Sequence, residues 1–386
     1  MSRLEDLLQT LCPDGVEKLR LSKICEIRRG QRITKSELIP EGPFPVISGG
    51  INPMGFTTDF NRNENTITVA QYGTAGFVNW QTKKFWANDV CYSIYPNKEL
   101  LNKYLYYFLL STQDIIYTLV IDAVPAHLPQ SRLAALEILV PPLPVQEEIV
   151  RILDTFSGVV TELEAEHAAR VRQYEHYRNE LLSFDSGSKI VENLFADFGL
   201  DSVEFTNLGE VVDILDSQRK PVTKSQRKPG PFPYYGANGI QDYVAGYIFD
   251  GTFLLLGEDG SVINPDGSPI LTWATGKIWV NNHAHILAEK NNGALLRYLY
   301  YYLQTVDVSK VVRGVPPKIN QENLRKIRVA LPPREVQEQI VSILDRFDTL
   351  VNDLKSGLPA EIALRRKQYE YYRDKLLTFP AKQPPL

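Results

Sequence analysis

The stretch Pro332–Phe379, PPREVQEQIVSILDRFDTLVNDLKSGLPAEIALRRKQYEYYRDKLLTF, occurs twice in this chain. The earlier copy, PPLPVQEEIVRILDTFSGVVTELEAEHAARVRQYEHYRNELLSF, fills Pro141–Phe184. The first 16 residues of the two copies share 11 identities, and the last 13 share 8. The offset between the copies grows from 191 to 195 residues, so the later copy carries four extra residues in its middle. A repeat of this length constrains the architecture before any motif is interpreted.

Each copy predicts a long helix that is entered through a proline pair, because proline ends the element before it. Apolar residues recur in steps of four and three, which is a heptad pattern. The first seam consists of Ile149, Leu153, Phe156, Val160, Leu163, His167, Arg170, Tyr174, Tyr177, Leu181 and Phe184. The second consists of Ile340, Leu344, Phe347, Val351, Leu354, Leu358, Ile362, Arg365, Tyr369, Tyr372, Leu376 and Phe379. Two successive steps of four, from Leu354 to Ile362, form a stutter, and Ser356–Pro359 (SGLP) predicts a kink or a short break there.

A helix of about 40 residues spans roughly 60 Å and has one apolar stripe, so it needs a partner. The other copy is the natural partner. Since each helix follows a similar domain, we expect the two to pair antiparallel about a pseudo-two-fold axis, as a coiled coil. The alternative is that each helix belongs to an ordinary bundle within its own duplicated domain.

Two globular regions, 1–140 and 185–331, precede the helical spacers 141–184 and 332–386. In the first, β-branched or aromatic runs broken by Gly, Asn and Pro predict strands, and a helix is expected over Lys98–Ser111. The strand-like runs are Pro45–Ser48, Thr66–Ala70, Ala75–Trp80 and Val90–Tyr95. Each region ends in a short predicted strand, Glu137–Val140 or Arg328–Leu331, before the proline pair. Ser183–Lys189 is the one stretch typical of a linker.

The second globular region repeats the plan of the first. Pro43-Phe44-Pro45 matches Pro231-Phe232-Pro233, and Lys103–Tyr107 (KYLYY) matches Arg297–Tyr301 (RYLYY). The segment Val124–Leu128 (VPAHL) likewise matches Val315–Ile319 (VPPKI). The predicted fold class is therefore α+β, with two tandem mixed α/β domains that are each followed by a long helix. The loops differ more than the frame, as in readers of two different short signals, although neutral drift would also produce this.

The composition is that of a globular chain with two cores, since 386 residues exceed the usual size of one domain. The N-terminal residues MSRLEDLLQTLCPDG contain no apolar run of the signal-peptide kind, and no segment approaches about 18 consecutive apolar residues. The three cysteines are unclustered, which indicates a reducing cytoplasm and neither a disulfide framework nor a metal site. A net charge of −4 argues against an indiscriminate polyanion binder, so nucleic-acid contacts would need local basic patches.

Motifs for catalysis are missing from the sequence. It contains no phosphate loop, dinucleotide fingerprint, nucleophile elbow or Asn-Pro-Pro-aromatic run of an adenine methyltransferase. His283 and His285 could ligate a metal from one strand face. No third ligand is evident, so a buried, hydrogen-bonded pair within a strand Ile278–Leu287 is the favoured interpretation. We therefore expect no catalytic activity, cofactor or metal.

Two basic loops lie at equivalent places in the halves, because Thr34-Lys35-Ser36 and Thr223-Lys224-Ser225 match at an offset of 189. Arg and Lys neutralise phosphates and recognise guanine, and Gln recognises adenine. Either loop alone could be a solvated surface, but the pair favours DNA. The candidate DNA-binding residues are Arg28, Arg29, Gln31, Arg32 and Lys35 in the first half, and Arg219, Lys220, Lys224, Arg227 and Lys228 in the second. Tyr72, Tyr234, Tyr235 and Asn238 lie nearby and are further candidates.

The repeats, the proline-led helices and the phrase GLPAEIALRRKQYEYYRDKLL at Gly357–Leu377 resemble the specificity subunit of type I restriction–modification systems over essentially the whole chain. The resemblance implies two target recognition domains, each of which reads half of a split double-stranded DNA target in the major groove. It also implies that the paired helices act as a spacer, and that the chain has no enzymatic activity.

The same resemblance implies protein partners: two methyltransferase subunits, which use S-adenosylmethionine, and restriction subunits that bind through them. Gln146, Glu147, Gln337 and Glu338, near the bases of the helices, are the candidate docking residues, whereas Val145 and Val336 could equally serve packing. The competing hypothesis is a coiled-coil scaffold for proteins alone, without sequence-specific DNA binding.

Overall fold

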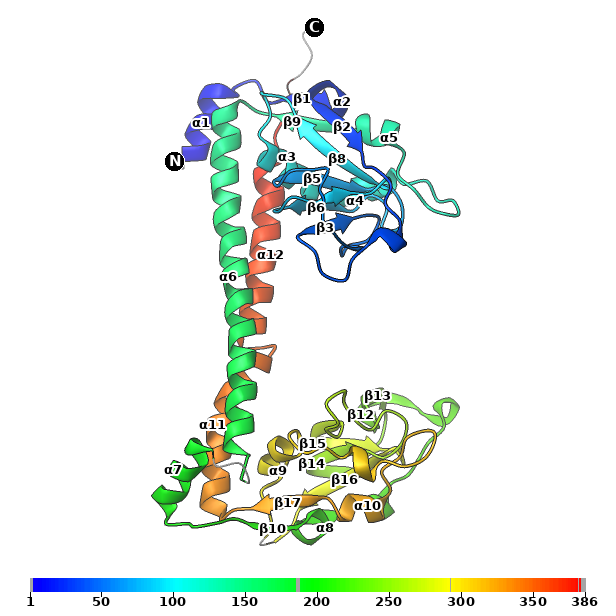
Figure 1. The fold of residues 1–386 in the computed structure, drawn as a ribbon, viewed down its shortest axis with the longest axis vertical. Helices are drawn as coiled ribbons and strands as arrows, with labels where there is room; N and C mark the ends of the chain where they lie inside the picture. The colour runs from blue at the N-terminus through cyan, green and yellow to red at the C-terminus, as the bar shows by residue number, and fades with distance from the viewer. Residues whose placement is uncertain (1–2, 185–187, 292, 381, 383–386) are drawn as a thin grey trace. The chain divides into compact units, whose positions relative to one another are not determined.

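The computed structural model describes residues 3–184, 188–291, 293–380 and 382. The chain divides into two compact units (Figure 1). Unit 1 comprises residues 1–164 and 361–386, and unit 2 comprises residues 165–360. Each unit contains one globular domain and a part of both repeated helical stretches. Residues 185–187 of the expected linker lie outside the described residues, as do residue 381 and residues 383–386 of the second spacer.

Unit 1 builds its globular domain on small, mostly antiparallel sheets. Its elements are α1 (Arg3–Leu11), β1 (Glu17–Arg20), α2 (Leu21–Ile24), β2 (Cys25–Arg29), β3 (Phe44–Ile47), β4 (Gly55–Thr57), β5 (Thr66–Ala70), β6 (Val78–Gln81), β7 (Trp86–Ala87), β8 (Cys91–Pro96), α3 (Asn102–Ser111), α4 (Gln113–Thr118), α5 (Gln130–Ala134) and β9 (Glu137–Val140). The strand orders are β2-β8-β5-β6, β4-β3-β7 and β1-β9, and every strand pair in them is antiparallel except β3 with β7. The expected strands and the expected helix are thus present, with ends displaced by a few residues.

Unit 2 repeats this order of elements. They are α7 (Lys189–Phe198), β10 (Glu204–Asn207), α8 (Leu208–Val211), β11 (Val212–Ile214), β12 (Pro229–Gly236), β13 (Gly239–Val244), β14 (Phe249–Gly257), β15 (Leu271–Val280), β16 (Ala284–Glu289), α9 (Leu296–Leu303), α10 (Gln321–Arg325) and β17 (Arg328–Leu331). Six strands form one sheet in the order β11-β16-β14-β15-β12-β13, and β10 pairs with β17.

One long strand explains the different sheet counts of the two units. In unit 1, β6 pairs with β5, and the separate β7 pairs parallel with β3. In unit 2, β15 alone makes both contacts, because it pairs antiparallel with β14 and parallel with β12. The continuous β15 therefore joins the strands of unit 2 into one six-stranded sheet, whereas the equivalent strands of unit 1 form two separate sheets.

The first repeat forms a single helix, α6 (Leu143–Leu181), as expected. Within unit 1 its first part packs against α12 (Leu358–Leu376), the red helix of Figure 1. Phe156 stacks on Tyr372 with ring centroids 5.1 Å apart, and Glu164 pairs with Arg366 at 2.5 Å. Residue numbers rise along one helix while they fall along the other, so the pair is antiparallel.

Within unit 2 the later part of α6 packs against α11 (Arg334–Asn352) in the same antiparallel sense. Tyr177 stacks on Phe347 at 5.5 Å, and His167 Nε2 lies 2.8 Å from the carbonyl oxygen of Val351. In both units one copy of the repeat is thus the partner of the other copy. The antiparallel coiled-coil pairing is confirmed over the alternative of separate bundles.

The second repeat is broken, as the stutter predicted. The helix stops at Asn352 and resumes at Leu358, with Pro359 in the first turn, where proline is tolerated. Gly357 is required there, since a Cβ would lie 2.5 Å from the carbonyl oxygen of Thr349. Leu354 falls in the break and is 80 % exposed, so this one position of the expected seam is not part of the packed stripe.

Each globular domain is fixed to its spacer by the repeated aromatic helix, α3 or α9. In unit 1, the Tyr107 hydroxyl donates to Asp154, and Lys103 lies 3.5 Å from the same carboxylate. In unit 2, Arg297 pairs with Asp345 and with Asp348, each at 2.7 Å. The matching motifs KYLYY and RYLYY are therefore attachments of domain to helix. Among the described residues, no helix is both long and apolar enough to span a membrane.

Candidate nucleic-acid interface

The basic loop of unit 1 follows β2 and presents most of its charge to solvent. Arg28 pairs with Glu26 at 2.6 Å, yet its side chain remains about half exposed. Arg29 donates from Nε to the Asp89 carbonyl. Gln31, Arg32 and Lys35 are exposed. This loop is thus open to a large polyanionic ligand.

A single helical turn shapes each basic loop at the matching Thr-Lys-Ser motif. Thr34 precedes the turn Lys35–Glu37, and its hydroxyl and backbone N–H both contact the Glu37 carboxylate. Thr223 precedes the turn Lys224–Gln226, and its hydroxyl donates to the Gln226 side chain at 3.0 Å, whereas Thr34 also donates from its backbone. Such a capping pair fixes the loop backbone, so Lys35 and Lys224 occupy equivalent exposed positions.

The basic loop of unit 2 uses two of its five cations internally. Arg219 is largely buried and pairs with Glu258 at 2.5 Å. Arg227 pairs with Asp242 at 3.3 Å and lies 4.1 Å above the Tyr234 ring. The exposed cations of this loop are Lys220, Lys224 and Lys228. Arg219 and Arg227 therefore support the loop, and the three lysines are the cations that it presents to solvent.

The candidate tyrosines fall into two groups. Tyr72 is half-buried and stacks on His127 with centroids 5.5 Å apart, at the domain surface. Tyr234 and Tyr235, with 1 % and 7 % exposure, are core residues, so the expectation that they reach base edges is wrong. The Tyr234 hydroxyl instead bonds to both backbone groups of Val222. Alternation along β12 could not reveal this, because the consecutive residues Tyr234, Tyr235 and Gly236 at its end are all buried.

Loops from distant parts of unit 1 converge beside its basic loop. The Asn88 side chain accepts from the Ile33 N–H at 3.1 Å and lies 3.3 Å from the Ser48 hydroxyl. The carbonyl of Gly49 accepts from both the backbone and the hydroxyl of Thr74, each at 2.8 Å. The glycine-rich loop at 48–51 and the loop at 71–74 therefore form one surface with the basic loop.

The corresponding surface of unit 2 rests on a buried charge network that the sequence did not predict. The His285 Nδ1 lies 2.6 Å from Asp216, and its Nε2 lies 2.8 Å from the Ile319 carbonyl. Both ring nitrogens therefore face oxygen atoms that can accept a hydrogen bond. Lys318 pairs with Glu258 at 3.0 Å and completes the network with Arg219.

The network shifts its two carboxyl groups toward the charged form. Burial raises the pKa of Asp216, but the hydrogen bond and charge of His285 outweigh it, so the pKa is lowered overall. Burial likewise opposes a lower pKa for Glu258, and hydrogen bonds from Arg219 and Lys318 reverse that effect. Both groups are ionised at neutral pH and are balanced by cations of the same domain.

The histidine pair differs from the expected one. Two strands, β15 and β16, replace the single strand Ile278–Leu287, and the chain turns a corner at residues 281–283, where Asn281 accepts from the His283 N–H. His285 is buried and hydrogen-bonded, as expected, but His283 is about half exposed and bonds to Asp259. Asp216 and Glu258 do lie close enough to join His285 around a cation. Arg219 and Lys318 already supply that positive charge, which favours an ion-pair network.

The candidate docking residues separate by burial. Gln146 and Gln337 have 0 % and 2 % exposure, so the expectation that these side chains contact a partner is wrong. Gln146 accepts from the Leu101 N–H and donates to two carbonyls, and Gln337 makes the matching bond to Leu295. Val145 and Val336 are fully buried and serve packing. Glu147 and Glu338 are exposed and stay candidates for docking.

Asn238 lies exposed in the turn between β12 and β13, beside the carbonyls of Ala237 and Ser261.

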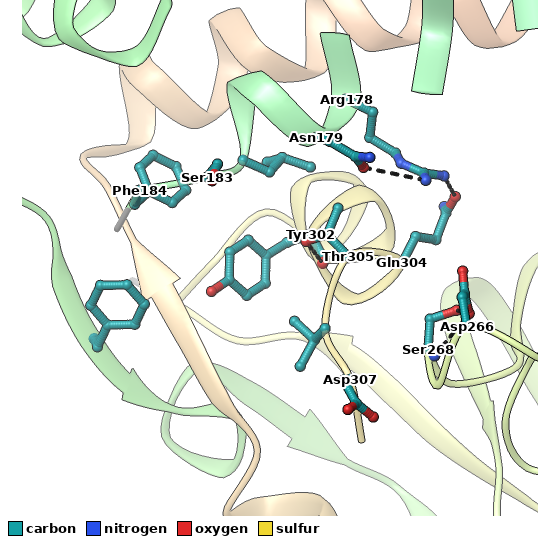
Figure 2. Close-up of a pocket in the computed structure, with 13 residues that line it drawn as sticks. Arg178, Asn179, Ser183, Phe184, Asp266, Ser268, Tyr302, Gln304, Thr305 and Asp307 are labelled. Atoms are coloured by element: carbon teal, nitrogen blue, oxygen red, sulfur yellow. Dashed lines mark hydrogen bonds between the residues drawn. The ribbon is translucent and has the colours of Figure 1, made fainter. Parts of the chain in front are cut away.

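A separate polar pocket of about 420 Å³ lies in unit 2 between the end of α6 and α9 (Figure 2). Arg178 donates to Gln304 at 3.0 Å along its wall, and Asp266 and Asp307 also line it. The mixed charges favour no single class of ligand, so we assign this pocket no role.

Comparison with known proteins agrees with this architecture. The family described as the type I restriction modification DNA specificity domain matches residues 13–173 and again 201–364. A Haemophilus influenzae protein provisionally named a type I restriction enzyme specificity subunit is 28 % identical over 97 % of this chain and 98 % of its own length. The EcoR124I/EcoR124II specificity subunit of Escherichia coli is 31 % identical over 62 % of this chain and 60 % of its own length.

Solved structures show the same fold. The S subunit of a type I restriction–modification system from M. genitalium has a TM-score of 0.67 at 21 % identity, and the match covers 94 % of this chain and 96 % of that one. Each matched family segment covers most of one globular domain and the first part of the helical stretch that follows it. The chain therefore belongs to the family of type I restriction–modification DNA specificity subunits, whose members are not themselves enzymes.

Proposed function

We propose that this chain reads a bipartite double-stranded DNA target, with one half-site for each unit. The two basic loops carry the proposal, because they occupy equivalent positions and are shaped by similar capped turns. In each unit the loop projects beside further loops from the same domain. Phosphate contacts from Arg32, Lys35 and Lys224 would position the DNA, and neighbouring loops would read base edges.

The recognition domains proposed here are residues 1–140 and 185–331, with spacers at 141–184 and 332–386. The complex would contain two methyltransferase subunits, and restriction subunits would bind through them. Glu147 and Glu338 are exposed near the helix bases and are suited to docking. We place the complex in the cytoplasm, consistent with three cysteines that are all free. The alternative of a scaffold without DNA recognition has no support from the family assignment.

Methylome sequencing of a host that expresses this chain with its methyltransferase subunit tests the proposal. We expect a split motif, with two short specified halves around an unspecified gap. If the assembled complex leaves no modified motif, the chain does not read DNA in this way.

The basic loops have a sharper test in the salt dependence of DNA binding by the assembled complex. Lys35→Ala and Lys224→Ala should each weaken binding to all sequences alike and reduce the slope of log K against log salt by about 1. Lys23→Ala is the matched control, because Lys23 is an exposed lysine of α2, which precedes β2, whereas the basic loop follows β2. Equal effects of Lys23→Ala and Lys35→Ala would argue against a localised contact.

A further inference from the structure

Each unit carries a loop whose tip projects an apolar side chain into solvent. Val124 in unit 1 and Val315 in unit 2 are fully exposed, at 104 % and 101 %. The two residues are equivalent, since both precede the proline of the matching Val-Pro pairs. Among the large hydrophobic side chains of the described residues, these two are the most exposed. A single exposed apolar side chain is ordinary on a protein surface, but here the same Val-Pro tip recurs at the equivalent place in both units.

The tips stand on fixed bases. In unit 1, the backbones of Ile121 and His127 exchange hydrogen bonds of 2.8 and 3.2 Å across the loop. In unit 2, Arg313 and Lys318 exchange bonds of 2.9 and 2.8 Å. Each base is also bridged to the loop beside it, His127 to Tyr72 and Lys318 to Asp259. Little conformational freedom remains to be lost when a ligand covers a tip held in this manner.

The two units have diverged where they are expected to read different sequences. The loop at 48–51 reads Ser-Gly-Gly-Ile, and its counterpart at 236–240 reads Gly-Ala-Asn-Gly-Ile. The Val-Pro tips were retained in the same chain beside these altered loops. A feature kept in both units suits a ligand that is the same for both, rather than a half-site that differs.

DNA is one such common ligand, but the charge around the tips disfavours it. Exposed Asp122 lies two residues before Val124, whereas Arg313 and Lys318 flank Val315. A polyanion that contacted both tips would meet a carboxylate at one and two cations at the other. Only the apolar valine and proline are common to both. Protein interfaces have apolar centres, whereas interfaces with DNA are more polar and strongly positive.

We propose that Val124 and Val315 are twin docking knobs, and that each inserts into an apolar pocket on one of two identical protein subunits. This inference rests on the proposed function, in which the common protein partner is the methyltransferase subunit. The knobs lie at the edge of the proposed reading surfaces, because the base of each tip is bridged to a neighbouring loop at Tyr72 in unit 1 and at Asp259 in unit 2. An enzyme that modifies a base within a half-site must be held at that edge.

The stoichiometry of the complex tests the proposal. The chain is co-expressed with its methyltransferase subunit, and the assembly is weighed by native mass spectrometry. Wild type should carry two methyltransferase subunits, Val124→Glu or Val315→Glu one, and the double variant none. Val124→Ile and Val315→Ile are the matched controls and should keep both subunits. The Glu variants should melt as wild type does, because neither valine side chain is covered by the described part of the chain.

Several outcomes would overturn the proposal. Full assembly of the double Glu variant would exclude docking through the tips, and a loss of methylation in that assembled complex would assign the tips to DNA instead. If wild type binds no methyltransferase subunit, the partner named in the proposed function is wrong and the docking proposal fails with it. The first result leaves the proposed function intact, so the two failures are distinguishable.

Discussion

At the scale of single residues, burial separates charges that the sequence presents as equals. Arg219 and Lys220 are neighbours in one basic loop, but Arg219 faces inward to Glu258 and Asp216 while Lys220 faces solvent. A buried carboxylate that loses its cation is costly, because nothing else solvates it. The two cations should therefore respond to substitution in opposite ways.

Arg219→Ala should destabilise unit 2 by about 3–5 kcal/mol, since it leaves Glu258 and Asp216 underbalanced in a desolvated site. Lys220→Ala should leave stability within about 0.5 kcal/mol of wild type while it weakens DNA binding. Urea denaturation followed by hydrogen exchange in β16 measures the first effect, and DNA titration measures the second. Equal stability losses for both variants would contradict the assignment of Arg219 to the core.

The same network predicts how unit 2 responds to acid. The pKa values of Asp216 and Glu258 are lowered from 3.8 and 4.5 in the folded state. Their stabilising contribution is therefore complete above those values and is lost as the pH falls through the lower folded values. We expect protection of β16 from hydrogen exchange to hold from pH 7 to 5 and to fall below about pH 4, after correction for intrinsic exchange. Asp216→Asn should flatten this dependence, and an unchanged profile would contradict it.

At the scale of elements, the repeat gives each spacer helix the same connection to its domain. The glutamine one turn into the helix enters the domain, where Gln146 accepts from Leu101 and Gln337 from Leu295, each at 2.8 Å. The next residue, Glu147 or Glu338, points to solvent. A helix that supports a reader in a fixed orientation needs such a buried connection.

Gln146→Ala should lower the stability of unit 1 by about 1–3 kcal/mol, because the buried Leu101 N–H loses its acceptor. Glu147→Ala is the matched neighbour and should leave stability unchanged. If Glu147 docks a methyltransferase subunit, its substitution should instead weaken that binding. Chemical denaturation measures the first role, and titration with the methyltransferase subunit measures the second. A Gln146→Ala variant as stable as wild type would show that Gln146 does not stabilise the attachment of the helix to its domain.

At the scale of the whole molecule, the tandem arrangement predicts that recognition is modular. Each unit has its own apolar core residues. In unit 1 the core includes residues of α6 such as Val145 and Ile149. A domain can therefore be exchanged without removing the core of the other. Symmetry between the repeats also means that two partner subunits would meet two equivalent surfaces.

Replacing residues 13–140 with the equivalent segment of another family member should change one half of the methylated motif. The other half and the gap should stay as in wild type, because unit 2 and both helices are unaltered. Methylome sequencing gives the result directly. Changes in both halves would mean that the domains do not read independently.

The sequence by itself determined the duplication, the strand before each proline pair, the pairing of the two helical copies and the break near Gly357. These features follow from local chemistry and periodicity, which single residues express wherever the chain lies. The corner at residues 281–283 was missed although Asn281 and Asn282 interrupt the apolar run, and asparagine is a turn-forming residue.

Only the tertiary structure decided which polar side chains are available to a ligand. Arg219, Tyr234 and Gln146 have ordinary surface chemistry in the sequence, yet each is enclosed by residues far away in the chain. Val124 and Val315 belong to an apolar residue type, yet nothing in the described chain covers them. Burial depends on contacts between distant segments, and a linear pattern does not contain those contacts.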